Sequence, residues 1–208
     1  MLAATILIVL APHLVRILAP TQSVDTVEAV ALVLQFLALG LVPLGASVLV
    51  KQAYFALEDG RSVFLIHIPM ALAWIGIAFW VRANAEPQWW VPGVALGLAV
   101  SNLVAILLRG WGLRARLGGF DGRRVASTYS KAFVAAIAAG AVGVLIMAVT
   151  PDTFSQAGWG AVFASLGIVA LAGAAMLATY VVAARVLRLS EVNELAASIT
   201  KRVRRRVP

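Results

Sequence analysis

Long apolar stretches separated by short polar connections dominate this chain. A stretch of about 18 or more apolar residues is long enough to cross a bilayer as a helix. The pattern predicts six such spans, and the first begins at Met1 without a polar lead-in, as expected of a span whose beginning is cut off. The predicted spans are about 2–19, 27–56, 62–82, 91–109, 130–150 and 156–186.

The composition agrees with a membrane protein, because 62% of the residues are hydrophobic and 12% are charged. Soluble domains have about twice that charged fraction. In lipid the backbone must satisfy its own hydrogen bonds, which leaves helices or a closed barrel. Stretches such as Ala132–Val149 lack the alternation of barrel strands. We therefore predict an all-α, polytopic integral membrane helix bundle with six transmembrane helices.

The basic residues indicate how the spans are oriented. If the N-terminus is cytoplasmic, all but two of the 17 Lys and Arg residues lie on the cytoplasmic side, and the exceptions are Arg16 and Arg82. This positive-inside pattern predicts a multi-pass protein with both termini cytoplasmic. The net charge of +8 thus favours contact of the basic loops with anionic phospholipid, and no nucleic acid partner is expected.

The chain divides into four predicted segments. Residues 1–110 hold four helices, and residues 111–127 form a basic cytoplasmic loop that is too polar to span. Residues 128–188 hold two further transmembrane helices. Residues 189–208 form a basic tail with apolar residues at helical spacing, ending in the cluster Lys201–Arg206. The tail is expected to be an interfacial helix or a frayed anchor.

No arrangement of residues in the sequence is typical of catalysis or metal binding. There is no cysteine, and His13 and His67 lie in apolar stretches without an acidic residue at helical spacing. This favours lone histidines whose hydrogen bonds are satisfied over a metal site or a proton relay. No Gly-rich phosphate loop is present. We therefore expect neither an enzyme nor a cofactor.

The second predicted span carries the clearest polar face. Its polar and helix-breaking residues recur at steps of three or four, which places them on one side of a helix; they are Gly40, Pro43, Ser47, Lys51, Tyr54 and Glu58. Gly40 and Pro43 are expected to kink the helix near mid-membrane. Lys51 either faces a cavity or is an anchor that extends to the interface. Gln35 lies deeper, where it is expected to bond a neighbouring helix or the substrate.

The fourth predicted span carries small residues four positions apart. Gly93, Gly97 and Ser101 have the spacing that lets two membrane helices pack closely. This pattern is common in membrane proteins, so we expect helix packing rather than ligand contact. Asn102 is the one amide of that span and is expected to make a buried polar contact.

The end of the second span resembles a motif of a known transporter family. It reads Leu49-Val-Lys51-Gln-Ala-Tyr54-Phe55-Ala56-Leu-Glu-Asp59-Gly-Arg61. This is similar to the R-x-F-Y-A-x-x-D-x-R/K-T-P turn of the MurJ/MviN lipid II flippases, in the multidrug/oligosaccharidyl-lipid/polysaccharide exporter superfamily. Here Tyr-Phe replaces Phe-Tyr, Lys51 is one position off register, and Ser62-Val63 replaces Thr-Pro. The segment Leu117–Arg124 also looks like the corresponding loop of actinobacterial members.

The resemblance implies a partial flippase fold. Family members have fourteen spans with both termini cytoplasmic, so six spans ending inside correspond to about spans nine to fourteen. Residues 1–110 would be four helices of the second lobe, and the two additional C-terminal helices would resemble a groove for a polyprenyl tail. The N-terminal lobe would be a partner in cis or in trans. The implied location is the bacterial cytoplasmic membrane.

The resemblance also implies an activity, which is alternating-access transport of lipid II, the undecaprenyl-linked peptidoglycan precursor. We expect the stripe of Gln35, Ser47 and Lys51 to face the cavity between the lobes. The residues that match the turn motif, which would shape the inner ends of two helices, are Lys51, Tyr54, Phe55, Ala56, Asp59 and Arg61. Two alternatives stay open: a polysaccharide or drug exporter of the same superfamily, and a truncated or non-transporting membrane scaffold.

Overall fold

The computed structural model describes residues 1–116, 122–150 and 152–187, and all regular elements in these ranges are helices. They are α1 (Leu2–Val9), α2 (Ala11–Leu18), α3 (Val24–Leu39), α4 (Leu41–Ala56), α5 (Gly60–Asn84), η1 (Pro87–Trp89), α6 (Trp90–Arg116), α7 (Gly122–Val149), η2 (Thr153–Ser155) and α8 (Trp159–Val186). Five stretches are long and apolar enough to cross a membrane. The predicted all-α polytopic membrane bundle is confirmed.

The first predicted span is not one continuous helix. It is divided at Leu10 into α1 and α2, and Pro12 lies in the first turn of α2. Proline has no N–H to donate to the carbonyl four residues earlier, and its ring crowds that carbonyl, so a helix ends before it. The expectation of a single helix over 2–19 was wrong for this reason. The count of six spans is therefore approximate, with five long stretches and one broken pair.

The second predicted span is kinked where the sequence indicated. The helix is interrupted at Gly40, between α3 and α4, and the N–H of Gly40 donates to the Leu37 carbonyl at 3.0 Å instead of continuing the regular ladder. A Cβ on Gly40 would lie 3.1 Å from the Cα of Ala99 in α6. The missing side chain thus lets the kink lie directly against α6, because a larger residue would push the two backbones apart.

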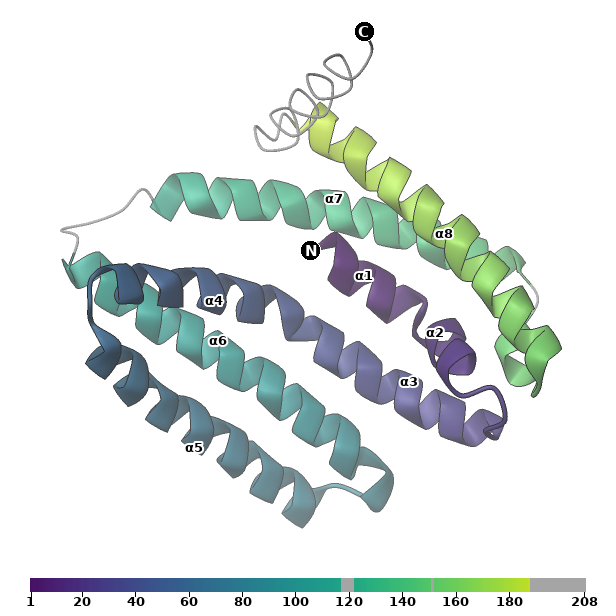
Figure 1. The fold of residues 1–208 in the computed structure, drawn as a ribbon, viewed down its shortest axis with the longest axis horizontal. Helices are drawn as coiled ribbons and strands as arrows, with labels where there is room; N and C mark the ends of the chain where they lie inside the picture. The colour runs from purple at the N-terminus through teal and green to yellow at the C-terminus, as the bar shows by residue number, and fades with distance from the viewer. Residues whose placement is uncertain (117–121, 151, 188–208) are drawn as a thin grey trace, which may run out of the picture.

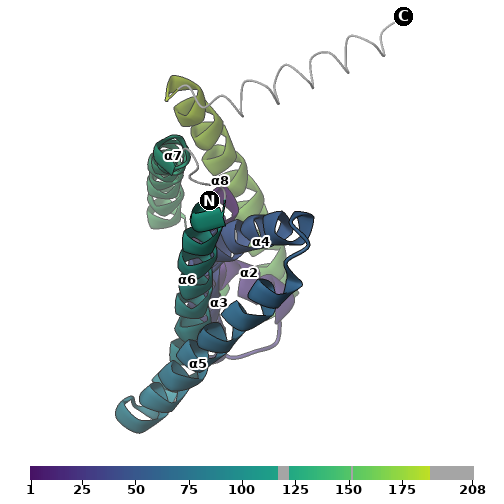
Figure 2. The same ribbon diagram turned by 90° about the vertical axis from the view of Figure 1, so that its left-hand side faces the viewer.

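The helices form a sequence of neighbouring layers (Figures 1 and 2). Helix α5 packs on α6, and α6 packs on α3 and α4. The broken pair α1 and α2 lies between α3 on one side and α7 and α8 on the other. Buried Leu10, at the break, packs with Ala139, Ala172 and Met176 in the contact between α1, α7 and α8. The short first helices therefore join the two C-terminal helices to the other four.

The basic loop is shorter in the structure than the polar pattern alone suggests. Helix α6 continues to Arg116 and α7 begins at Gly122. Residues 117–121 lie outside the described residues, as does most of the Leu117–Arg124 segment. The predicted interfacial tail at 189–208, with its cluster Lys201–Arg206, also lies outside the described residues.

Candidate functional site

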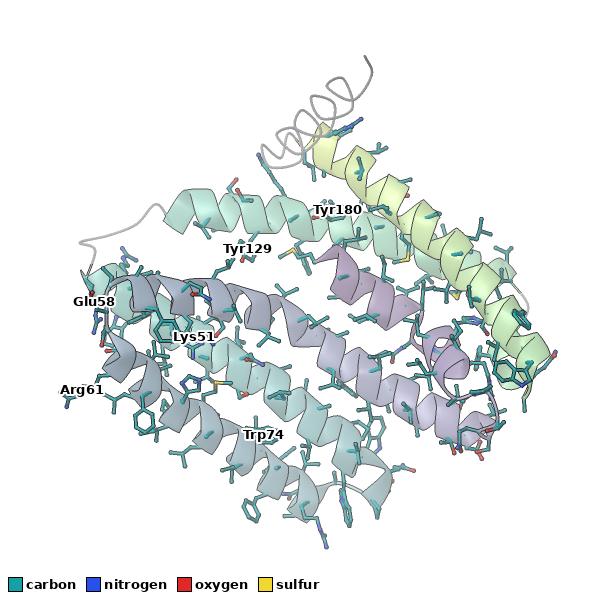
Figure 3. All side chains as sticks on the ribbon, viewed as in Figure 1. Lys51, Glu58, Arg61, Trp74, Tyr129 and Tyr180 are labelled. Atoms are coloured by element: carbon teal, nitrogen blue, oxygen red, sulfur yellow. The ribbon has the colours of Figure 1, made fainter. Side chains whose placement is uncertain are left out.

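The polar face of α4 packs against α6. Ser47 and Tyr54, seven residues apart, lie two helical turns from one another on one face, and both side chains are buried. Lys51 lies between them in the sequence and is half-buried. In Figure 3 Lys51 lies on the side of α4 toward α5 and α6, whereas Arg61 points outward from the bundle.

A buried arginine of α6 meets this face. Arg109 has only 3% of its surface exposed, and its Nη1 donates to the Ser47 hydroxyl and, at 3.4 Å, to the Ser47 carbonyl. The guanidinium pairs with no carboxylate in the described part of the chain, where the ion pair present joins Arg116 to Asp59. The charge pattern placed Arg109 among the cytoplasmic basic residues, and its position inside the predicted span 91–109 was the signal for a buried role.

The histidine of α5 completes the surroundings of Arg109. His67 Nδ1 lies 2.7 Å from the Val63 carbonyl, which can only accept, so Nδ1 carries the proton. Its Nε2 is then an acceptor and lies 3.5 Å from Arg109 Nη2. The other histidine, His13, lies 3.3 Å from the Ser165 hydroxyl. Each histidine thus has a hydrogen-bond partner, in agreement with the expectation of satisfied histidines from the sequence.

The turn between α4 and α5 has a defined geometry. The N–H of Glu58 donates to the Phe55 carbonyl and the N–H of Asp59 to the Tyr54 carbonyl, both at 3.0 Å. These two bonds, with Glu58 at a φ of +57°, form the Schellman arrangement that closes a helix C-terminus. Asp59 then caps the next helix, since its Oδ1 accepts from the Ser62 N–H at 3.0 Å. One short segment therefore ends α4 and begins α5.

The end of α6 holds this turn in place. Arg116 pairs with Asp59, donates to the Ser62 hydroxyl at 2.8 Å, and lies with its guanidinium carbon 5.2 Å from the centre of the Tyr54 ring. The Tyr54 hydroxyl donates to the Arg109 carbonyl at 3.0 Å. Gly112 lies under that hydroxyl, where a Cβ would collide with it. Tyr54 and Asp59 of the family motif thus contact α6.

The other residues that match the motif lie differently. Phe55, Ala56 and Arg61 are exposed, so the structure places them on the surface of the turn. The ammonium of Lys51 has no ion pair with a described residue. Among the motif residues, Tyr54 and Asp59 are therefore the ones held by tertiary contacts in the described part of the chain.

Gln35 supports the break between α1 and α2. Its Nε2 donates to the Ile8 carbonyl at 3.0 Å. That carbonyl is the one which Pro12 leaves without a helical partner, because Pro12 is the residue four positions later. Gln35 also lines an open groove of about 800 Å³ near the other end of the bundle, together with Asp25, Glu28 and Trp89. Gln35, Ser47 and Lys51 were predicted to form one stripe, but each of the three lies in a different environment.

The small residues of α6 lie against α5. A Cβ on Gly93 would be 2.6 Å from Val81 Cγ1, and one on Gly97 would be 2.9 Å from Ile77 Cγ2. Ser101 is fully buried, and its hydroxyl donates to the Leu98 carbonyl of its own helix at 2.8 Å. Asn102 likewise donates to Leu98. The two glycines therefore lie in the α5–α6 contact.

The two basic residues that depart from the charge pattern have local partners. Arg16 is fully buried and donates to the carbonyls of Phe154 at 2.7 Å and Gln22 at 2.8 Å. A cation near the end of α2 also complements the negative end of the helix dipole. The guanidinium of Arg82 lies 4.0 Å from the centre of the Trp90 ring. These contacts give a structural reason for both exceptions.

Comparison with known proteins supports the resemblance found at the α4–α5 turn. A family model described as lipid II flippase MurJ matches residues 1–160 of the 208. The matched range covers α1 to α7 and ends at the beginning of α8. No match was found among the curated proteins or among the solved structures. Because the match covers well over half of the chain, this chain belongs to the lipid II flippase MurJ family.

Proposed function

We propose that this chain acts as the C-terminal part, about spans nine to fourteen, of a lipid II flippase that works by alternating access. The observation that carries the proposal is the family match over residues 1–160. The turn geometry adds support, since Tyr54 and Asp59 make specific contacts with α6. The other lobe would come from the same polypeptide or from a separate one, and the family's members are transporters rather than enzymes.

The proposed orientation places both termini in the cytoplasm. Its support is the charge pattern, with all but two of the 17 basic residues on one side of the spans. Arg16 and Arg82 do not weaken it, because both are engaged by carbonyls or an aromatic ring. The basic inner surface would then contact anionic phospholipid.

Lys51 is the residue of the predicted stripe that we propose contacts the anionic headgroup of the substrate. Lys51 is half-buried and its ammonium has no ion pair with a described residue, so its positive charge is available to a phosphate. Ser47 and Gln35 are already bonded, to Arg109 and to the Ile8 carbonyl. We therefore assign them supporting rather than direct roles.

A second part of the proposal concerns the polyprenyl tail. A pocket of about 340 Å³ lies between α4 and the C-terminal helices, and its lining includes Leu41, Val42, Leu49, Tyr129 and Tyr180. Figure 3 shows Tyr129 on the side of α7 that faces α4. A mostly apolar pocket suits an isoprenoid chain, because burying its methylene groups is favourable. Helices α7 and α8 would thus guide the tail while Lys51 meets the headgroup.

Depletion of the native gene product in its own cells tests the function. An impermeant enzyme that cleaves lipid II from outside measures the fraction of lipid II on the outer face. We expect this fraction to fall as the protein is depleted, while total lipid II rises. An unchanged outer fraction would overturn the flippase proposal and favour a different cargo or a non-transporting role. Lys51→Ala, expressed at the normal level, is expected to restore transport only weakly.

A further inference from the structure

Arg109 brackets Lys51 on α4 from both sides. Its side chain donates to Ser47, four residues before Lys51, and its main-chain carbonyl accepts from Tyr54, three residues after it. A single residue of α6 therefore fixes the two helical turns that carry Lys51. Since both partners lie on the same face of α4, the attachments also fix the rotation of that helix about its axis.

The packing of α4 against α6 does not require a buried positive charge at Arg109. Its guanidinium is almost completely buried, pairs with no carboxylate in the described residues, and leaves its Nε without a hydrogen-bond partner there. Burying a charge is costly, and an apolar residue of similar volume often packs as well or better. A buried intramembrane cation is accordingly a mark of function.

We infer that Arg109 is a positioning residue that holds Lys51 toward the anionic headgroup of the substrate. The inference rests on the proposed function, because it needs Lys51 to contact that headgroup. The fork of the guanidinium reaches the hydroxyl and the carbonyl of Ser47 with one nitrogen and approaches His67 with the other. None of these partners is acidic, so the contacts that fix α4 place no negative charge beside Lys51 that would compete with the headgroup for its ammonium.

The test is the affinity for lipid II of the purified complete protein, meaning this chain together with its other lobe. The affinity is measured in detergent micelles by fluorescence titration. Arg109→Gln removes the charge and the fork, and we expect it to weaken binding about tenfold, as Lys51→Ala does. The double variant is expected to bind no more weakly than Lys51→Ala alone, because both changes act through the same ammonium. A matched control is Arg114→Gln, which removes an exposed charge from the same helix and is expected to bind normally.

Ser47→Ala provides a milder variant should Arg109→Gln fail to fold. It removes one acceptor of the guanidinium and is expected to weaken binding about threefold. The positioning role would be overturned if Lys51→Ala binds weakly while folded Arg109→Gln binds with normal affinity. If Arg109→Gln does not fold, normal affinity of Ser47→Ala would overturn it in the same way. Additive losses in the double variant would also overturn it. Normal binding by Lys51→Ala would instead remove Lys51 from the proposed function, so the two failures are distinguishable.

Discussion

The contact of Gly97 with α5 gives a quantitative test of the helix packing. An alanine Cβ at this position would lie 2.9 Å from Ile77 Cγ2 and 3.3 Å from Ile77 Cβ. The side chain of Ile77 is branched at Cβ and cannot rotate away cheaply. Alanine gains about 1 kcal/mol in helix propensity over glycine, whereas overpacking costs about 1–3 kcal/mol. Gly97→Ala is therefore expected to be neutral or to destabilise by up to about 2 kcal/mol.

Gly76→Ala is the matched control, because a Cβ there meets no atom within 4 Å. Its only expected effect is the higher helix propensity of alanine, which should stabilise the folded protein by about 1 kcal/mol. The measurement is the free energy of unfolding of the purified protein in mixed micelles. The two variants should differ by about 1–3 kcal/mol, and adding Ile77→Leu, which removes the colliding methyl, should recover most of the loss. Equal effects of the two alanines would refute the close α5–α6 packing.

Three further predictions use the same unfolding measurement. Glu58→Gly is expected to stabilise by about 1 kcal/mol, because Glu58 has a left-handed φ of +57° that glycine adopts without cost; a loss of stability would contradict the turn geometry. Gln35→Leu is expected to destabilise by about 1–3 kcal/mol, because it leaves the Ile8 carbonyl unpaired; an effect no larger than that of exposed Gln52→Leu would contradict this. Tyr54→Phe is expected to cost about 1 kcal/mol through the lost bond to Arg109, and an equal effect of exposed Tyr129→Phe would refute that contact.

Features set by local sequence could be predicted in advance. Apolar length is enough to place the long helices, since a bilayer requires about 20 apolar residues per span. The kink at Gly40 was also predictable, because a glycine followed by Pro43 weakens a helix whatever surrounds it. The break at Leu10 was missed although Pro12 signals it, because the apolar run hides the interruption when hydropathy alone sets the boundaries.

Contacts between distant parts of the chain could not be predicted in this way. Nothing in the sequence indicates that Arg109 meets Ser47, which lies 62 positions away, or that Arg16 meets the Phe154 carbonyl. The charge pattern treats both arginines as topology signals, because it depends on their position relative to the spans and not on their partners. The same limit holds for Gln35, whose bond to Ile8 depends on how α3 packs against α1.

The central claim is tested most directly by transport in vesicles that contain the purified complete protein, meaning this chain together with its other lobe. The quantity to measure is the initial rate at which lipid II becomes accessible on the opposite face of the bilayer. We predict a rate clearly above that of protein-free vesicles, and a several-fold lower rate for Lys51→Ala at equal protein content. A rate equal to that of protein-free vesicles, with folded protein present, would contradict the assignment of this chain to lipid II transport.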